Sequence, residues 1–217
     1  MPELIIKTLE VGMLGTSCYL VMDGSPGPGF IIDPGAEARV IVEVAGSSGM
    51  ACRGILCTHG HMDHVGAVGK VAQALEAPVY VSEPDSGALT GHGQGITGRL
   101  TSLAVSKPGG VNIIRGGDTL EFGKRSLSVL ETPGHTPGSV SFLCDDNLFC
   151  GDLVFAGSVG RTDLRGGSFA DLLDSVIRHV FTLPDDAVIY PGHGPSTTVG
   201  RERASNPFLR ELGARGR

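Results

Sequence analysis

Several features of common protein classes are missing from this chain of 217 residues. It has no run of lysine and arginine, and its net charge is −6, which argues against a nucleic-acid-binding surface. No apolar run approaches the ~18 residues needed to cross a bilayer, so no membrane-spanning segment is expected. The first residues, Met1 to Lys7, enter a strand-like run directly and lack the pattern of a signal peptide. These absences predict a protein with neither nucleic acid nor membrane among its partners.

The cysteines have neither the even count nor the spacing of a disulfide or zinc framework. There are five, without a CxxC pair: Cys18, Cys52, Cys57, Cys144 and Cys150. Three of them lie in apolar strand-like runs, so we expect reduced core residues of a cytoplasmic protein. The length suits a single large domain over residues 1–217 with a substantial core.

The densest group of chemically active side chains is Thr58-His59-Gly60-His61-Met62-Asp63-His64. We expect an apolar strand before it, at residues 54–57, and a helix with apolar residues at helical spacing after it, at 65–75. Gly60 lets the backbone turn so that the imidazoles can converge. Asp63 falls at the helix start, where a carboxylate is favoured. A helix cap needs one oxygen and not three imidazoles beside it, so the group predicts a metal site.

Strands and helices are expected in both halves of the chain. Strands are expected at residues 4–6, 18–22, 30–32, 54–57, 78–81, 111–114, 119–122, 126–130, 139–144 and 187–190, and helices at 37–45, 65–75, 168–183 and from about 201. In the helix at 168–183, Ser168 is the expected cap and one apolar stripe is formed by Phe169, Leu172, Leu173, Val176, Ile177 and Val180. Hairpin loops and short alternating strands do not suit a purely parallel sheet. The expected fold class is therefore α/β, with two mixed β-sheets flanked by helices.

Residues 86–110 contain seven glycines and little periodicity, which predicts a surface insertion that could act as a mobile flap. His92 lies in this insertion and is expected to be a solvated loop histidine. His179 lies beside the apolar stripe and is expected to be exposed. Residues 213–217 are expected to fray.

Four more potential ligands follow apolar strands, each beside glycine or proline: Asp33, His135, Asp152 and His193. Loops at one rim of a sheet scaffold are where sites are built, so we expect these side chains near the histidine cluster. Asp33 alone could equally be a turn residue. The summed set is too large for one tetrahedral ion and suits two divalent ions that share a bridge; it comprises His59, His61, Asp63, His64, His135, Asp152 and His193. Imidazole and carboxylate without thiolate favour zinc first, with iron or manganese as alternatives.

The string His59-Gly60-His61-Met62-Asp63-His64, with His135, Asp152 and His193 behind it, resembles the metallo-β-lactamase superfamily. The resemblance covers roughly residues 4–208. It implies an αββα sandwich with the metal site at one edge. It also implies a division of the ligands: His59, His61 and His135 for the first metal, Asp63, His64 and His193 for the second, and Asp152 as the bridge. Asp33 and Thr58 would support the metal loop from behind.

Within the superfamily the chain is similar to glyoxalase II on four segments, at residues 132–138, 160–164, 190–194 and 202–207. It departs from that enzyme in two ways. The chain stops soon after residue 208, without the helical C-terminal segment that helps to bind glutathione there. Two tyrosines of glyoxalase II are also absent, and Arg161 stands where it has a lysine. Arg161 could contact an anionic part of the substrate or form a surface ion pair.

The resemblance implies a dinuclear, glyoxalase II-like hydrolase that cleaves S-lactoylglutathione or another small thioester. Asp63 would orient the attacking hydroxide, and Asp152 would fix the separation of the ions. The alternative is a persulfide dioxygenase with one Fe(II) on His59, His135 and Asp152, because such proteins keep the same HxHxDH string. A non-catalytic metal-binding protein would be expected to have lost a ligand, and none is missing. The oligomeric state is not indicated by the sequence.

Overall fold

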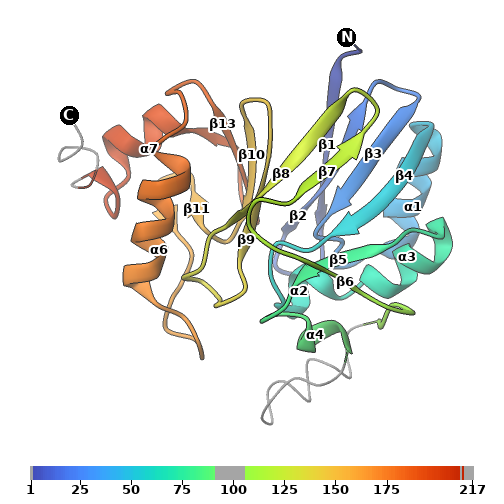
Figure 1. Ribbon diagram of the computed structural model, residues 1–217, viewed down its shortest axis with the longest axis horizontal. Coiled ribbons are helices and arrows are strands. Elements are labelled where there is room, and N and C mark those ends of the chain that lie inside the picture. The colour runs from blue at the N-terminus through green and yellow to red at the C-terminus, as the bar shows by residue number, and fades with distance from the viewer. Residues whose placement is uncertain (1, 91–105, 211, 213–217) are drawn as a thin grey trace.

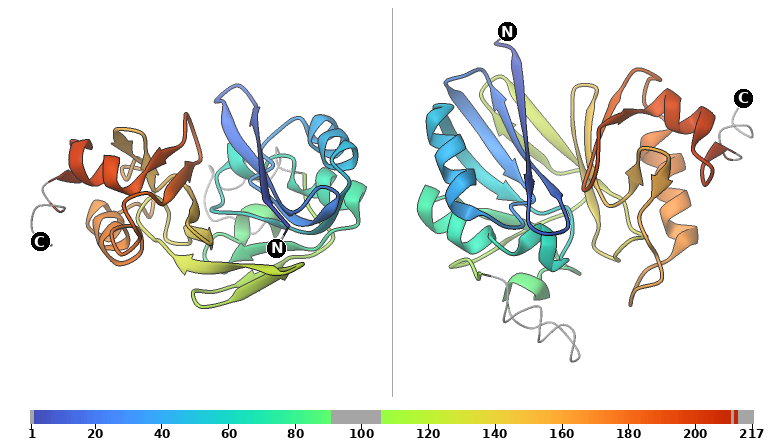
Figure 2. Two further views of the ribbon diagram at one scale, coloured as in Figure 1. Left: turned by 90° about the horizontal axis from the view of Figure 1, so that it is seen from above. Right: turned by 180° about the vertical axis from the view of Figure 1, so that it is seen from behind.

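The protein is described by a computed structural model in which residues 2–90, 106–210 and 212 are placed. Two six-stranded β-sheets face each other, and helices lie on their outer faces (Figures 1 and 2). Each sheet contains both parallel and antiparallel strand pairs. The predicted α/β class with two mixed sheets is therefore confirmed.

The first sheet is formed by the N-terminal half of the chain, with its strands in sequence order. They are β1 (Leu4–Val11), β2 (Thr16–Asp23), β3 (Gly27–Ile32), β4 (Met50–Leu56), β5 (Val79–Ser82) and β6 (Asn112–Ile114). Hairpins make β1 to β3 antiparallel, whereas β3 to β6 are parallel neighbours. The crossovers between the parallel strands carry α1 (Ala38–Ser47) and α3 (Val68–Leu75), which cover the outer face (Figure 1).

The second sheet is formed by later segments in the order β14-β13-β10-β9-β8-β7. Its strands are β7 (Thr119–Phe122), β8 (Arg125–Glu131), β9 (Val140–Cys144), β10 (Asn147–Gly151), β13 (Val188–Pro191) and β14 (Thr197–Thr198). The parallel pair β10 and β13 is connected by a small hairpin, β11 (Val154–Phe155) and β12 (Ser158–Val159), and by α6 (Phe169–Ser175) with a π-helical turn, η1 (Val176–Val180). Together with α7 (Val199–Ser205), α6 covers the outer face (Figure 1).

The core has three layers because each sheet is apolar on both faces. Between the sheets, aromatic and branched side chains interlock, and the ring of Tyr19 meets that of Phe149 edge-on at 5.3 Å between centroids. The outer layers are filled by the apolar faces of α1 and α3 on one side and of α6, η1 and α7 on the other. All five cysteines are free thiols, and all except the half-buried Cys52 are buried, as the sequence predicted.

Two predicted helices differ in the structure. The single helix expected at 65–75 is divided into α2 (Met62–Val65) and α3, because the chain turns at Gly66 and Ala67. Gly66 packs so closely on Gly35 that a Cβ would lie 2.4 Å from the Gly35 carbonyl oxygen, and the Ala67 amide donates to Pro34. Because of this packing, residues 66 and 67 form a turn and the predicted helix is not continuous.

The stripe predicted for the helix at 168–183 is only partly correct. Ser168 caps α6 by accepting a hydrogen bond from the Asp171 amide, as expected. The buried face is carried by Leu172, Val176 and Val180, whereas two members of the predicted stripe are exposed, Phe169 and Ile177. The π-helical turn, closed by the Phe181 amide on the Val176 carbonyl, displaces the register from that of a regular α-helix.

Part of the glycine-rich stretch is described. Residues Gly87–Thr90 form the short helix α4, and the chain reappears at Ser106, whose amide donates to Gly66. Residues 91–105, including His92, and the tail 213–217 lie outside the described residues, so the predictions of a flap and of fraying remain predictions. Within the part of the chain that is placed, no helix has the length and apolarity required to cross a bilayer.

Candidate metal centre

The predicted ligands lie close together in the structure. Two of them, Asp63 and His64, belong to α2, which lies at one edge of the sandwich (Figure 1). The reason is topological, because the carboxyl ends of neighbouring parallel strands lie at the same edge of a sheet. Asp33 and His59 follow the parallel strands β3 and β4, and Asp152 and His193 follow the parallel strands β10 and β13. His135 follows β8 of the second sheet. The five loops thus converge from both sheets.

The first group of ligands consists of His59, His61 and His135, whose ring nitrogens converge within 4.8 Å. His61 Nδ1 and His135 Nε2 are 2.8 Å apart. The other nitrogen of His135, Nδ1, donates to the Arg161 carbonyl at 2.7 Å. That bond fixes the ring and leaves Nε2 as the lone-pair nitrogen that a metal requires.

The second group consists of Asp63, His64 and His193. His64 Nε2 and His193 Nε2 are 3.3 Å apart, and Asp63 Oδ2 lies 3.3 Å from His193 Nε2. The far nitrogens are again held by acceptors, because His193 Nδ1 contacts the Leu14 carbonyl and His64 Nδ1 contacts Asp33. Both histidines therefore direct Nε2 at the same point.

Asp152 lies between the two groups. Its Oδ2 is 3.4 Å from His135 Nε2 in the first group. Its Oδ1 is 3.3 Å from His64 Nε2 and 3.8 Å from His193 Nε2 in the second. One carboxylate thus faces both groups, which is the arrangement that a bridging ligand requires.

The buried polar atoms of the cluster indicate that a cation fits here. Among the described residues, two buried side-chain atoms have no hydrogen-bond partner, His59 Nε2 and Asp152 Oδ1. Leaving a buried polar group unpaired costs ~1–3 kcal/mol, so such atoms need a partner. Both belong to the ligand set, and imidazole with carboxylate is a donor set for zinc, iron or manganese. The residues present therefore fit a dinuclear metal site.

The electrostatics of the cluster also favour a cation. Burial, then neighbouring imidazoles, lower the pKa values of His59 and His61, so both rings are neutral ligands at neutral pH. Burial would lower the pKa of His64 too, but Asp33 and Asp152 outweigh it and raise that pKa to about 10. Burial likewise opposes ionisation of Asp152, yet its histidine neighbours hold its pKa below the usual range. The carboxylates are thus charged and attract positive charge.

Asp33 and Thr58 lie behind the metal loop. Asp33 accepts the Thr58 amide at 2.7 Å and the Thr58 hydroxyl at 2.5 Å, and its Oδ2 also contacts His64 Nδ1 at 2.8 Å. Asp33 has φ of 50°, a conformation that is uncommon for a residue with a side chain. These contacts fit the supporting role that the resemblance implies, rather than that of an isolated turn residue.

Two contributors were not predicted from the sequence. The Thr16 hydroxyl donates to Asp63 Oδ2 at 3.4 Å. Asp85 contacts the loops of both the His59-His61 pair and His135 through hydrogen bonds from Gly60 and Thr136. Asp85 follows the apolar strand β5, so the strand-end pattern that revealed Asp33 could have revealed it also.

Comparison with known proteins places this site in a family. The model of the metallo-β-lactamase superfamily matches residues 11–193, most of the chain and every predicted ligand. The chain belongs to the metallo-β-lactamase superfamily. The predicted resemblance to the superfamily is therefore confirmed, and so is the fold class.

Individual members of the superfamily match over almost the whole chain. The probable metallo-hydrolase YqgX of Bacillus subtilis is 35% identical, covering 94% of this chain and 96% of its own. The hydroxyacylglutathione hydrolase GloC of Haemophilus influenzae is 32% identical, over 94% of this chain and 97% of its own length. The family and these names together support a metal-dependent hydrolase.

Solved structures of similar proteins have the same fold. BLEG-1, a B3 metallo-β-lactamase, has a TM-score of 0.86 at 34% identity, covering 94% of this chain and 99% of its own. TTHA1623 in a di-iron-bound form has a TM-score of 0.81 at 38% identity, covering 94% of this chain and 100% of its own. ETHE1 from Myxococcus xanthus has a TM-score of 0.75 at 27% identity, covering 98% of this chain and 92% of its own. The di-iron form fits a dinuclear site in this superfamily and leaves the identity of the metal open.

The side chains of the two remaining predicted residues of this superfamily member, Arg161 and His179, belong to neither ligand group. The exposed Arg161 side chain forms an ion pair with Asp163 through two hydrogen bonds of 2.8 Å. The surface-pair alternative is therefore what the structure shows, and a substrate contact stays a prediction. His179 is half-buried on η1, more enclosed than expected, and it belongs to neither ligand group.

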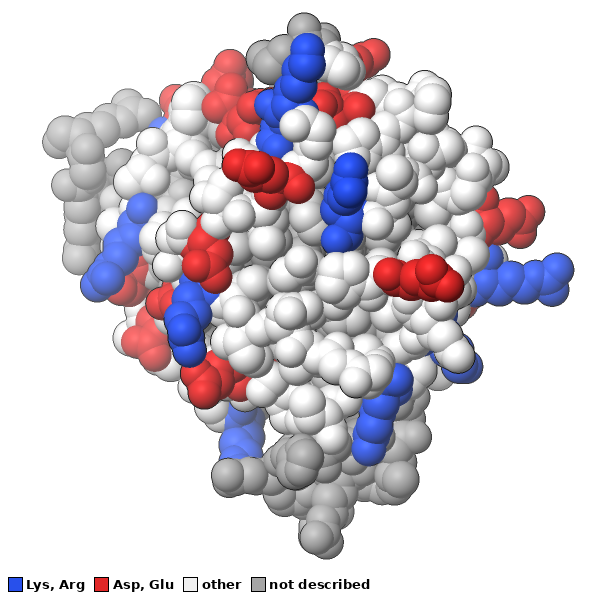
Figure 3. Space-filling model, turned by 45° about the vertical axis from the view of Figure 1, so that its right-hand side comes forward, with Lys and Arg blue, Asp and Glu red and all other residues white. Residues whose placement is uncertain are grey.

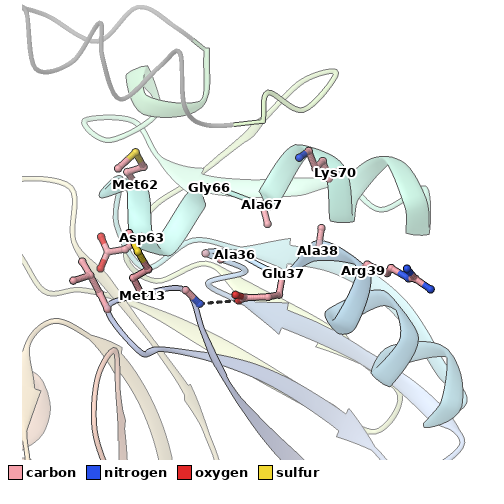
Figure 4. Close-up of a pocket in the computed structure, with 13 residues that line it drawn as sticks. Met13, Ala36, Glu37, Ala38, Arg39, Met62, Asp63, Gly66, Ala67 and Lys70 are labelled. Atoms are coloured by element: carbon pink, nitrogen blue, oxygen red, sulfur yellow. Dashed lines mark hydrogen bonds between the residues drawn. The ribbon is translucent and has the colours of Figure 1, made fainter.

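A groove of about 630 Å³ begins at Asp63 and runs between α1 and α3 (Figure 4). Met13 and Met62 flank the Asp63 end, and Arg39 and Lys70 lie at the opposite end (Figure 4). The Gly12 amide donates to Glu37 at 2.7 Å, which attaches the loop between β1 and β2 to the start of α1. The groove thus has apolar walls beside Asp63, a predicted ligand, and basic residues at its far end.

Charges elsewhere are dispersed. On the face in Figure 3, lysine and arginine side chains are separated by acidic and uncharged ones and form no continuous basic patch. The far face is not visible in that view, and the prediction that nucleic acid is not a partner stays a prediction.

Proposed function

We propose that this superfamily member is a dinuclear metal-dependent hydrolase that cleaves thioesters of small molecules. The observation that carries the proposal is the position of Asp152 between two groups of convergent ligands, with one oxygen directed at each. The di-iron form of TTHA1623 and the hydrolase names of YqgX and GloC support it.

The ligand residues have defined tasks in this proposal. His59, His61 and His135 would hold one ion and Asp63, His64 and His193 the other, with Asp152 between them. Such ions lower the pKa of bound water towards neutrality and polarise a carbonyl. Asp63 remains a carboxylate at neutral pH because its hydrogen bond with His193 outweighs burial and lowers its pKa. It can therefore accept a hydrogen bond from the attacking water and orient it.

The substrate contacts favour a broad thioesterase over a strict glutathione enzyme. Arg161 is engaged by Asp163, so a glutathione carboxylate would have to displace that partner. The apolar walls of the groove beside Asp63 can accept a thiol arm of different chemistry. We therefore expect S-lactoylglutathione to be hydrolysed with a high KM, and other thioesters to be hydrolysed comparably or better.

The test is kcat/KM over a panel of thioesters, measured on protein loaded with zinc, iron or manganese. Chelator-treated protein and His59→Ala are the inactive references. Asp163→Ala, which frees Arg161, should lower KM for S-lactoylglutathione but not for a thioester with an uncharged thiol. A low KM and a strong preference for the glutathione thioester would refute weak recognition.

The second candidate is the persulfide dioxygenase that would use His59, His135 and Asp152 for one iron. The structural similarity to ETHE1 is what favours it. Metal content per chain, together with oxygen uptake on glutathione persulfide, separates the two candidates. Oxygen uptake without hydrolysis of any thioester would select the dioxygenase. Hydrolysis of a chromogenic β-lactam but of no thioester would instead select a lactamase, the activity in the name of BLEG-1.

A further inference from the structure

Asp85 connects the two loops that carry His61 and His135. It lies in the segment after β5, which is parallel to β4, so it emerges at the same edge of the first sheet as the histidine loop. Its Oδ2 accepts a hydrogen bond from the Gly60 amide at 2.9 Å and another from the Thr136 hydroxyl at 2.7 Å. Gly60 lies between His59 and His61, and Thr136 follows His135 directly.

The two bonds join separate halves of the molecule. The Gly60 loop follows a strand of the first sheet, and the Thr136 loop follows a strand of the second. His61 and His135 are 74 positions apart in sequence, yet their facing nitrogens are separated by 2.8 Å. A single carboxylate oxygen therefore connects two loops, one from each sheet, that contribute ligands to the same group.

Close packing shows that Asp85 occupies a defined position. A Cβ on Gly60 would lie 3.2 Å from the Asp85 Cβ, and a Cβ on Gly138 would lie 2.6 Å from Asp85 Oδ1. The turn after His135 is held further by Ser82, which donates to the Gly138 carbonyl, and by Ser139, which contacts the Thr136 hydroxyl at 2.8 Å. The two loops thus close around Asp85.

We propose that Asp85 is a positioning residue for the first metal, because it fixes the spacing between His61 and His135. It would act through the backbone of Gly60 and the side chain of Thr136, which donate hydrogen bonds to its carboxylate. The inference rests on the ligand groups of the proposed function but not on the reaction, so a binding measurement tests it without any substrate.

The experiment is a competition titration of metal-free protein with zinc and with cobalt(II), whose absorption spectrum reports the coordination of each site. His61→Ala and His64→Ala identify the signals of the first and second sites. Asp85→Ala should weaken the first site by about 10- to 100-fold, the usual effect of losing an outer partner of a ligand, and the second site by less than about threefold.

Three further variants sharpen the test. Both hydrogen bonds end on Oδ2, so Asp85→Asn can keep them with its amide oxygen and should retain the affinity of the first site. Thr136→Val removes one of the two bonds and should give an intermediate loss, even if Asp85→Ala does not fold. Glu83→Ala, which removes an exposed acid paired with Arg115 at 3.5 Å, should change neither site.

Several results would overturn the proposal. Equal weakening of both sites by Asp85→Ala or Thr136→Val would indicate general destabilisation rather than positioning. Unchanged affinity of the first site in both would show that the ligand spacing is set elsewhere. Weakening by Asp85→Asn as large as by Asp85→Ala would assign the effect to the negative charge.

Discussion

At the scale of single residues, the predicted ligands differ in how many ligand groups they face. Asp152 faces ligands of both groups, whereas His193 faces only the second group and Asp152 itself. The functions of the two side chains in metal binding should therefore be separable.

We expect Asp152→Ala to deplete both metals together, because each would lose one of its oxygens. His193→Ala should chiefly deplete the second metal, since His59, His61 and His135 remain in place. Elemental analysis of purified variants, compared with wild type, checks both expectations. Full metal occupancy in Asp152→Ala would contradict the bridging role.

The thiols give a second prediction at this scale. Burial raises the pKa of Cys150 to about 12 and those of Cys52 and Cys144 to about 11, and it also raises the pKa values of Cys18 and Cys57 well above their usual range. At about pH 8 all are therefore protonated, and protonated thiols react poorly. Folded protein should resist an alkylating reagent that labels all five cysteines after unfolding, as mass spectrometry can measure. Rapid labelling of the folded chain would contradict this burial.

At the scale of elements, the strand ends decide the geometry of the site. Each ligand loop leaves its strand where a glycine or proline permits a sharp turn, and the backbone then approaches other ligands closely. Gly192, just after β13, is such a place, because a Cβ there would lie 2.2 Å from Asp152 Oδ1 and 2.7 Å from His64 Cε1.

Gly192→Ala should therefore displace the ligands, lower metal content and reduce the free energy of unfolding by ~1–3 kcal/mol. Gly46→Ala in α1 is the matched control, since a Cβ there meets nothing within 4 Å. It should stabilise the helix by up to ~1 kcal/mol and leave metal content unchanged. Denaturant unfolding and elemental analysis measure both effects. Equal metal loss in the two variants would contradict the packing argument.

At the scale of the whole molecule, α7 is attached to the second sheet through one buried acid. Glu202 on α7 is fully buried, and its carboxylate accepts hydrogen bonds from the Thr197 hydroxyl at 2.6 Å, the Gly157 backbone amide at 2.9 Å and the Asn206 side-chain amide at 2.8 Å. The segment at 202–207, which resembles glyoxalase II, thus has a structural function in this fold.

Glu202→Ala should lower the free energy of unfolding by ~2–5 kcal/mol, because it leaves these donors without their acceptor. The exposed Glu43 on α1 provides the control, and Glu43→Ala should change stability by less than ~0.5 kcal/mol. Urea unfolding, followed by circular dichroism on metal-free protein, compares the two. A loss below ~1 kcal/mol for Glu202→Ala would show that the network contributes little.

The sequence by itself determined which strands end beside potential metal ligands, and it predicted the ligand set from them. The HxHxDH string is local, and an apolar strand followed by glycine or proline can be recognised without knowing its partners. Only the tertiary structure decided how the ligands are grouped, because His61 meets His135, and His64 meets His193, across 74 and 129 positions of chain. The break between α2 and α3 and the position of Asp85 likewise depend on contacts between distant segments. Periodicity reports the environment of one segment, whereas these features depend on which segment packs against it.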